Sequence, residues 1–318
     1  MLKFISNRLL QMLIVALGVV FIVFTILRLS PIDPIRTVLG EQATEEQVET
    51  MREEMGLNDP FLIQFFNYIK NIIFHGDFGI SYVNEKPVAN ELLTRLPVSL
   101  TLALVSTLIG AIVGIPIGVI AALKQNSIYD NAGSIICLIF VAMPNFWTAL
   151  MLILIFAVNL GWFPASGWYG PQYMILPMIA AGLPCAASVM RNTRSNMLEV
   201  IRQDYIRTAR AKGQKESVIV TKHALRNALI PVVTIICMQF AVSLGGSFVI
   251  ETVFAIPGLG KFLVDGASLH NIPVVQGGVI LMAVSLSLVN LLMDILYTKI
   301  DPRLSFTKKA TKKRRAAV

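Results

Sequence analysis

The side chains that could carry out chemistry are few in this sequence, and they are scattered. The chain has three histidines and three cysteines: His75, His223, His270, Cys137, Cys185 and Cys237. The histidines lack the spacing of metal ligands, and each cysteine lies in an apolar run without a CxxC partner. The nearest match to a phosphate-binding loop, GLGKF at 258–262, has the wrong spacing and no Ser or Thr after its lysine. The sequence therefore predicts no catalytic residue, no metal and no cofactor.

A second group of polar side chains lies inside long apolar segments, where polar groups are costly. Gln239, Ser243 and Ser247 recur every four residues, so they would share one face of a helix. Asn145 and Asn290 lie in two other apolar segments. These five residues are candidates to line a path for a peptide-like solute. The alternative is hydrogen bonding between neighbouring helices, which membrane bundles use widely.

The most strongly basic internal segment is 191–228, where Arg and Lys greatly outnumber Asp and Glu. Two helices are expected in it, the second over about 216–227. The first is expected to place its apolar residues on one face: Leu198, Ile201, Tyr205 and Ala209. Gly213 can end that helix in a left-handed conformation. A rigid, charged hairpin of this kind would either lie in the lipid interface or be held by a cytoplasmic partner.

The composition indicates what must position these residues. Of the 318 residues, 55% are hydrophobic and only 14% are charged, whereas a soluble domain carries about 25% charged residues. This excludes a disordered chain, a collagen-like chain, a small disulfide scaffold and an ordinary soluble enzyme. The sequence therefore predicts an all-α membrane protein.

Six charge-poor segments are long enough to cross the hydrocarbon core of a bilayer. They cover approximately 9–27, 97–123, 132–160, 173–190, 229–250 and 274–296. A cleaved signal peptide is the alternative for the first segment, but that segment is long and no small-x-small cleavage pattern follows it, so a retained helix is favoured. We expect six transmembrane helices.

The loop charges predict the direction of the spans. The net charge is +8, and the basic residues gather in 191–228 and in the tail 308–315, whereas 30–96 is mainly acidic. By the positive-inside rule, both termini and 191–228 are expected in the cytoplasm, and six spans allow this. The basic tail is expected to face anionic lipid headgroups rather than nucleic acid.

The long loop after the first span is expected to be helical. Thr44-Glu45-Glu46-Gln47 has the form of a capping box, and Gly56 can end the helix that it starts. Asp59-Pro60 is expected to start a second helix that is rich in aromatic residues. This loop would serve as a structural plug or would contact solute directly.

Several motifs resemble one family of membrane proteins. DYIRTARAKG at 204–213 and HALRNALIP at 223–231 resemble the permease loop of bacterial ABC importers. More narrowly, the sequence resembles the dipeptide, oligopeptide, nickel and glutathione permeases of these importers. The resemblance extends over nearly the whole chain. Further matching motifs are RLSPIDP at 28–34, GDFG at 76–79, IPGLG at 256–260 and DILY at 294–297. Ile32 departs from the family, which usually has Gly there, and the loop lacks the Glu of the broader permease motif.

The resemblance implies a type I ABC importer permease fold. It implies an N-terminal part at 1–93 with the first span and the external helical loop, a transmembrane domain at 94–300, and a cytoplasmic tail at 301–318. It also implies that the first helix of 191–228 is a coupling helix seated on an ATPase subunit. The residues that take this role are Asp204, Tyr205, Arg207, Thr208, Ala209, Arg210, Ala211 and Gly213.

The implied function is that of one permease subunit of an ATP-driven importer for peptides or similar small solutes in a bacterial cytoplasmic membrane. The implied partners are a second, homologous permease, one or two ATPase subunits that bind the ATP, and an extracytoplasmic solute-binding protein. The alternative is a secondary transporter driven by an ion gradient, which needs paired buried acids or broken helices at mid-membrane. Only Asp294 comes close to this, and it lies near the surface.

Overall fold

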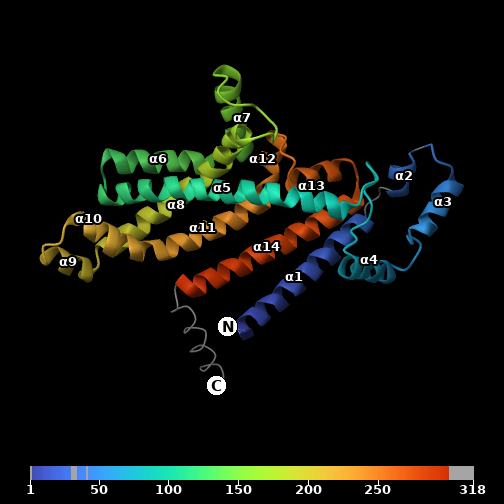
Figure 1. Ribbon diagram of the computed structural model, residues 1–318, viewed down its shortest axis with the longest axis horizontal. Helices are drawn as coiled ribbons and strands as arrows, with labels where there is room; N and C mark the ends of the chain where they lie inside the picture. The colour runs from blue at the N-terminus through green and yellow to red at the C-terminus, as the bar shows by residue number, and fades with distance from the viewer. Residues whose placement is uncertain (1, 30–33, 41, 301–318) are drawn as a thin grey trace. The chain divides into compact units, whose positions relative to one another are not determined.

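The computed structural model describes residues 2–29, 34–40 and 42–300 (Figure 1). Within these residues the regular secondary structure is helical, apart from one isolated bridge between Ile80 and Pro87. The all-α prediction is confirmed. The elements are α1 (Leu2–Arg28), α2 (Pro34–Leu39), α3 (Glu45–Glu54), α4 (Phe61–His75), α5 (Val88–Leu123), α6 (Ile128–Ala142), α7 (Asn145–Leu152), η1 (Ile153–Asn159), α8 (Pro171–Ile201), α9 (Asp204–Ala211), α10 (Glu216–Val218), η2 (Ile219–Leu225), α11 (Arg226–Gly246), α12 (Phe248–Val253), α13 (Leu259–Ser268) and α14 (Ile272–Ile300).

The helices form two compact units. Of the described residues, the first unit contains those up to 100 and 255–288, and the second contains 101–254 and 289–300. Five of the described helices are long and apolar enough to cross a membrane by themselves, and the count is six if one bent pair forms a single span. With the bent pair counted as one span, this agrees with the six transmembrane helices expected from the sequence.

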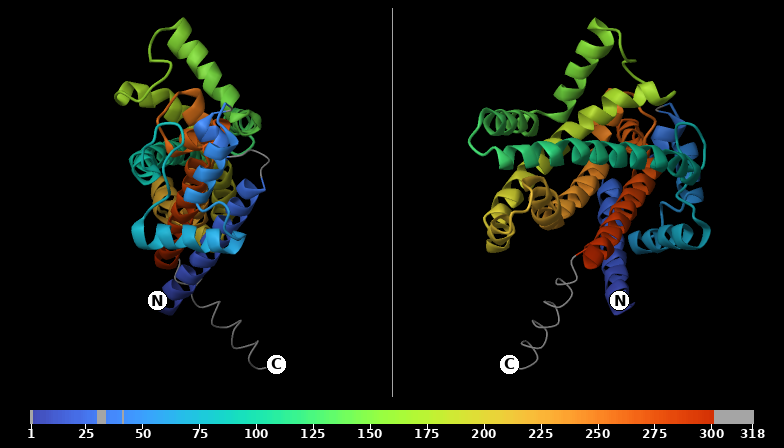
Figure 2. Two further views of the ribbon diagram at one scale, coloured as in Figure 1. Left: turned by 90° about the vertical axis from the view of Figure 1, so that its right-hand side faces the viewer. Right: turned by 60° about the vertical axis from the view of Figure 1, so that its left-hand side comes forward.

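The bent pair corrects the prediction of a continuous third helix over 132–160. Helix α6 ends at Ala142, and the chain continues from Asn145 in a direction turned by 106° (Figures 1 and 2). Pro144 explains the break, because a proline disfavours the helical conformation of the residue before it. Met143 accordingly has an extended backbone, with φ −71° and ψ 131°.

Three other spans differ from their expected ends. Helix α5 begins at Val88 instead of 97, and α8 continues to Ile201 instead of 190, so each has a polar extension of the apolar span. The fifth span is interrupted at Ser247, where α11 passes into the short helix α12. In the extension of α5, Arg95 and Glu91 form an ion pair one turn apart.

The first unit is held together by aromatic packing of α4 against α1. The ring of Phe24 lies 5.4 Å from that of Phe61 and 5.5 Å from that of Phe65, and both pairs meet edge to face. The expected capping box is confirmed at the start of α3. The backbone N–H of Gln47 donates to Thr44 Oγ1 over 3.4 Å, and the backbone N–H of Thr44 donates to Gln47 Oε1 over 3.0 Å.

The second unit is built around α8, which packs against α5, α6 and α11. Helix α8 approaches α5 closely where Gly110, Gly114 and Gly118 lie one turn apart. A Cβ atom on Gly114 would lie 2.6 Å from the carbonyl oxygen of Ala186, and one on Gly118 would lie 2.6 Å from that of Met190. The two backbones therefore approach each other as in the small-xxx-small packing of membrane helices. We call this junction the glycine seam.

Candidate functional site

The candidate coupling helix is α9, a separate short helix that two residues separate from the end of α8. Gln203 before it has an extended backbone, with φ −70° and ψ 148°. Asp204 lies in its first turn, where the helix dipole favours an acidic side chain. Gly213 follows its end with φ +72°, a left-handed conformation that suits glycine, and its N–H donates to the carbonyl of Arg210 over 2.9 Å. The expected stop at Gly213 is thus observed.

The expected apolar face is observed for Ala209, which is buried, but it is wrong for Tyr205, which is exposed. Leu198 and Ile201 belong to α8, and the break at residues 202–203 changes the helical phase before Tyr205. The buried face of α9 consists of Ile206 and Ala209, whereas Tyr205 is 44% exposed. Tyr205 therefore belongs to the outer surface of the helix.

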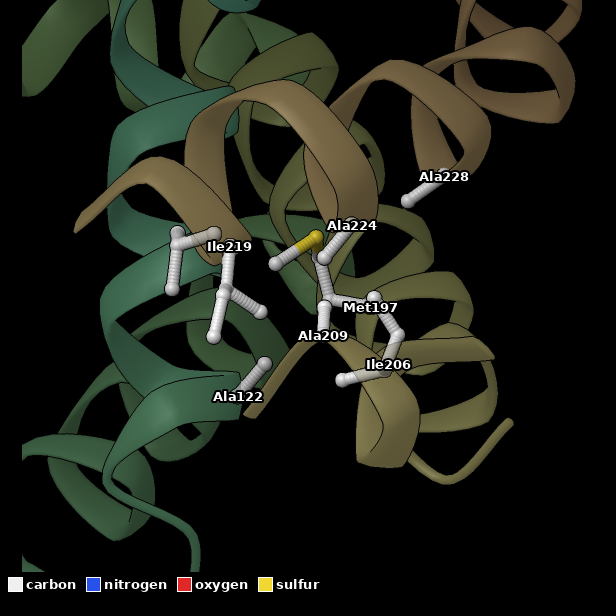
Figure 3. Packing of buried hydrophobic residues seen from close by; sticks show 8 residues of the cluster. Ala122, Met197, Ile206, Ala209, Ile219, Ala224 and Ala228 are labelled. Carbon is white, nitrogen blue, oxygen red and sulfur yellow. The ribbon is translucent and has the colours of Figure 1, made fainter. Parts of the chain in front are cut away.

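The inner face of α9 rests on a small apolar cluster (Figure 3). Its buried members come from α5, α8, α9, η2 and α11: Ala122, Met197, Ile206, Ala209, Ile219, Val220, Ala224 and Ala228. The methyl side chain of Ala209 is used here, within the chain, rather than at a surface that a partner could reach. The many alanines let short helices pack closely, and the cluster fixes α9 against the helices on either side of it in the sequence.

Polar contacts also tie α9 and its turn to the following helix. The side-chain amide of Asn227 donates to Tyr205 Oη over 3.0 Å. Arg210 binds Glu216 through two hydrogen bonds, of 2.6 and 3.2 Å, and this bonding raises the pKa of the arginine above its usual value. His223 Nε2 and Gln214 Oε1 lie 2.9 Å apart, within hydrogen-bonding distance. We call the segment 204–227 with these contacts the α9 hairpin.

The outer face of α9 presents most of the residues expected to bind a partner. The exposed ones are Asp204, Tyr205, Arg207, Thr208, Arg210, Ala211 and Gly213. Arg207 and Asp204 are 3.7 Å apart at their closest charged atoms and are both highly exposed, so solvent screens their attraction. The outer face thus carries the aromatic ring of Tyr205 and the exposed guanidinium of Arg207, and the guanidinium of Arg210 is bound to Glu216.

The second helix of the hairpin runs directly into the membrane-spanning helix. The expected helix over 216–227 is observed as α10 followed by η2, a π-helical turn, and α11 continues from Arg226 to Gly246 without a gap. Pro231 lies inside α11 and does not interrupt it. Helices α10, η2 and α11 therefore form one continuous helix that begins just after the turn at the end of α9.

The candidate path residues have different surroundings. Ser247 is buried, and its hydroxyl donates to Glu251 Oε1 over 2.8 Å, so it is used inside its own chain. Gln239 and Ser243 are half-buried on α11, and Asn145 and Asn290 are exposed on α7 and α14.

The sequence reasoning missed two buried acids. Glu251 has no exposed surface, although only Asp294 was expected near the membrane; the Asp294 side chain lies outside the described residues, as do 30–33 and the tail 301–318. The spacing of Ser247 and Glu251, one helical turn apart, is a readable signal for such a pair. Asp130 is 2% exposed and accepts a bidentate interaction from Arg194 on α8. Their separation by 64 residues means that no local pattern could have revealed this pair.

The described residues contain no group of three or more His, Cys, Asp or Glu side chains that could hold a metal ion.

The glycine seam was also missed, although its signal is present in the sequence as glycines at every fourth position from 110 to 118. The seam explains how α5 and α8 are held together.

Comparison with known proteins gives consistent results. Residues 114–306 match the model of the binding-protein-dependent transport system inner membrane component, and residues 1–103 match the model of the N-terminal region of such membrane components. The dipeptide transport system permease protein DppB of Alkalihalophilus pseudofirmus is 37% identical over 334 residues, which cover 96% of this chain and 100% of that protein. The glutathione transport system permease protein GsiC of Escherichia coli K12 is 39% identical over 306 residues, which cover 96% of this chain and 100% of GsiC.

The fold has a counterpart among solved structures. An inward-facing structure of the MetNI methionine ABC transporter matches with a TM-score of 0.58 and 21% sequence identity, over 66% of this chain and 96% of that chain. A second crystal form of MetNI matches with a TM-score of 0.54. The structural likeness supports the permease fold, and the sequence matches carry the assignment. The chain belongs to the family of multi-pass inner-membrane permease components of binding-protein-dependent transport systems, the non-catalytic membrane components of bacterial ABC importers.

Proposed function

We propose that this chain forms half of the translocation path of an ATP-driven importer and that α9 is the helix through which ATPase subunits drive it. The observation that carries the proposal is the construction of the α9 hairpin. Its inner face is fixed by Ile206 and Ala209 in an apolar cluster, while its outer face exposes Arg207 and Tyr205. A helix that is rigidly attached to a span but open on its outer side is suited to receive a push from a partner.

The other half of the path is proposed to be a second, homologous permease, so the functional unit is a heterodimer with one or two ATPase subunits and an extracytoplasmic solute-binding protein. The family membership supports partners of the latter two kinds. Both termini and the α9 hairpin are proposed to be cytoplasmic, because basic residues dominate 191–228. Gln239, Ser243, Ser247, Asn145 and Asn290 remain the candidates for the path.

The transported solute is proposed to be a dipeptide, an oligopeptide or a peptide-like molecule such as glutathione. The support is the identity to DppB and GsiC over nearly the whole chain. Uptake of labelled dipeptides and glutathione into proteoliposomes that contain the complete transporter and its binding protein tests this proposal. Uptake of neither solute, with ATP hydrolysis intact, would contradict it.

Charge reversal on α9 tests the docking role. Arg207→Glu places an acid on the outer face, and it is expected to lower solute-stimulated ATP hydrolysis and co-purification of the ATPase at least about tenfold. Lys222→Glu is the matched control, because it reverses an exposed charge on η2 rather than on α9. Equal hydrolysis by both variants would contradict the docking role.

Labelling tests the proposed topology. Thr208→Cys places a thiol on the exposed face of α9. In intact cells it is expected to be protected from a membrane-impermeant maleimide and to react after the inner membrane is made permeable. Reaction in cells whose inner membrane is intact would place the hairpin outside and would refute the coupling role.

A further inference from the structure

The first unit contains a cavity of about 680 Å³. Its walls are the end of α1, the end of α3 with the turn that follows it, the polar side of α4 and the start of α14. The volume lies in the range of small-molecule binding sites. Gln64 fixes the wall formed by the turn, because its side-chain amide donates to the carbonyls of Leu57 and Asp59 over 2.9 and 2.6 Å. The cavity is therefore formed by a braced part of the fold.

The cavity lining contains a buried hydroxyl whose hydrogen bonding is incomplete. Tyr68 lines the cavity, and its Oη is buried without a hydrogen-bond partner among the residues that the structure describes. Its ring packs against Phe24, with 5.8 Å between the ring centroids. Buried polar groups in proteins almost always have partners. Burial, and secondarily the charge of Asp77, raises the pKa of Tyr68, so the hydroxyl remains a donor at neutral pH.

The other polar groups of the lining offer donors and acceptors together. Asn67 and Asn71 lie one turn apart on α4, and both line the cavity. A side-chain amide has the same donor and acceptor groups as a peptide bond. Arg28 and Arg52 supply guanidinium groups, one N–H of Arg28 donates to the carbonyl of Leu57, and Asp59 supplies a carboxylate. The lining therefore complements a molecule that has amide groups and charges of both signs.

We propose that this cavity binds a small zwitterionic solute with amide groups, of the class of di- and tripeptides. The inference rests on the proposed function, because a peptide importer supplies this class of solute on the side where the cavity is expected. The guanidinium of Arg28 would bind the terminal carboxylate, Asp59 the terminal ammonium, and Tyr68 with the two asparagines the peptide groups between them. A phosphate of a lipid headgroup is the alternative occupant, because Arg28 and Arg52 could bind it, and glycerol 3-phosphate represents this alternative in the test below.

Photo-crosslinking to the complete transporter tests the proposal. The transporter is placed in phosphatidylcholine nanodiscs without its binding protein and exposed to the tripeptide alanyl-benzoylphenylalanyl-alanine. Labelling is expected within 24–28 and 64–71. Excess trialanine is expected to reduce it about tenfold, whereas its acetylated amide, which lacks both charges, and glycerol 3-phosphate are expected to compete poorly.

Substitutions sharpen the result. Tyr68→Phe is expected to reduce labelling about fivefold by removing one hydrogen bond, and Arg28→Gln about tenfold or more by removing the carboxylate partner. Tyr129→Phe changes an exposed tyrosine of the second unit and is expected to leave labelling unchanged. Labelling only outside these segments, competition by glycerol 3-phosphate alone, or wild-type labelling of both Tyr68→Phe and Arg28→Gln would overturn the proposal.

The same nanodiscs separate this inference from the proposed function. With the binding protein and its solute added, ATP hydrolysis is measured on the same preparation. Solute-stimulated hydrolysis without labelling of the cavity overturns the cavity proposal alone. Labelling that trialanine displaces, in a complex whose hydrolysis does not respond to solute, supports the cavity and overturns the coupled importer.

Discussion

The glycine seam and the α9 hairpin join helices of the same unit in different ways. In the seam, α5 meets α8 through glycines, and the neighbouring backbones lie so close that a single Cβ atom would not fit. In the hairpin, α9 meets its neighbours through aliphatic side chains and through hydrogen bonds such as that between Asn227 and Tyr205. Packing between α5 and α8 depends on close steric fit, because the hydrophobic effect does not drive helices together within lipid. The exposed hairpin can instead be stabilised by burial of apolar side chains and by polar pairs.

The largest effect is expected from filling the seam. Gly114→Leu would place a side chain where the carbonyl oxygen of Ala186 and the side chain of Val189 already lie. We expect a loss of about 3 kcal/mol or more in unfolding free energy, measured by thermal unfolding in detergent. Gly18→Leu on α1 is the control, because nothing lies within 4 Å of its Cβ position. Equal melting temperatures of the two variants would show that the seam tolerates a side chain.

The next largest effect is expected at the buried ion pair beside the seam. Asp130→Ala leaves the guanidinium of Arg194 without its buried carboxylate and the backbone N–H of Asn126 without its acceptor. We expect a loss of about 3 kcal/mol, because breaking a buried pair leaves an uncompensated charge. Thermal unfolding at low and high salt measures it. A loss that disappears at high salt would show that the pair behaves as an exposed one.

A smaller effect is expected at the end of α9. Gly213→Val forces a β-branched residue into a backbone with φ +72°, at a cost of about 1–2 kcal/mol. The strain would disturb the turn between α9 and α10, so solute-stimulated ATP hydrolysis should fall while insertion and folding of the spans are retained. Gly246→Ala, at an open helical position without positive φ, is the control. Normal hydrolysis by Gly213→Val would separate the turn geometry from coupling.

The smallest effect is expected at the exposed ion pair of the hairpin. Glu216→Gln removes the carboxylate that binds Arg210, and both side chains are about half exposed. We expect a loss below about 1 kcal/mol that fades as salt is added. Comparison with Asp130→Ala under the same conditions tests the contrast between the two pairs. A larger loss from Glu216→Gln would mean that polar contacts, rather than the apolar cluster, hold the hairpin.

Local sequence patterns were sufficient for part of the fold. The capping box at Thr44, the stop at Gly213 and the existence of the spans follow from short-range rules, and the structure shows all of them. The bend at Pro144 also has a local cause, but the uncharged run around it concealed the end of α6. A charge-free stretch indicates which residues can lie within the bilayer, but it does not reveal where a helix breaks.

The candidate site was harder to predict because its details depend on tertiary contacts. The break between Ile201 and Asp204 contains neither Gly nor Pro, so the apolar pattern appeared to continue and Tyr205 was wrongly expected to be buried. Burial of Ile206 follows from its packing with Met197 and Ala224, which lie on other helices. The location of the hairpin was predictable, but the orientation of its side chains was not.

The glycine seam has a mechanical consequence. Backbone lies against backbone over about two helical turns, so α5 and α8 cannot slide past each other without a steric clash. The two helices are therefore expected to move as one rigid body when the translocation path opens or closes. Movement within this unit during transport is then expected at other positions. The bend between α6 and α7 at Met143 and Pro144 is the natural hinge, because no helical hydrogen bonds resist bending there.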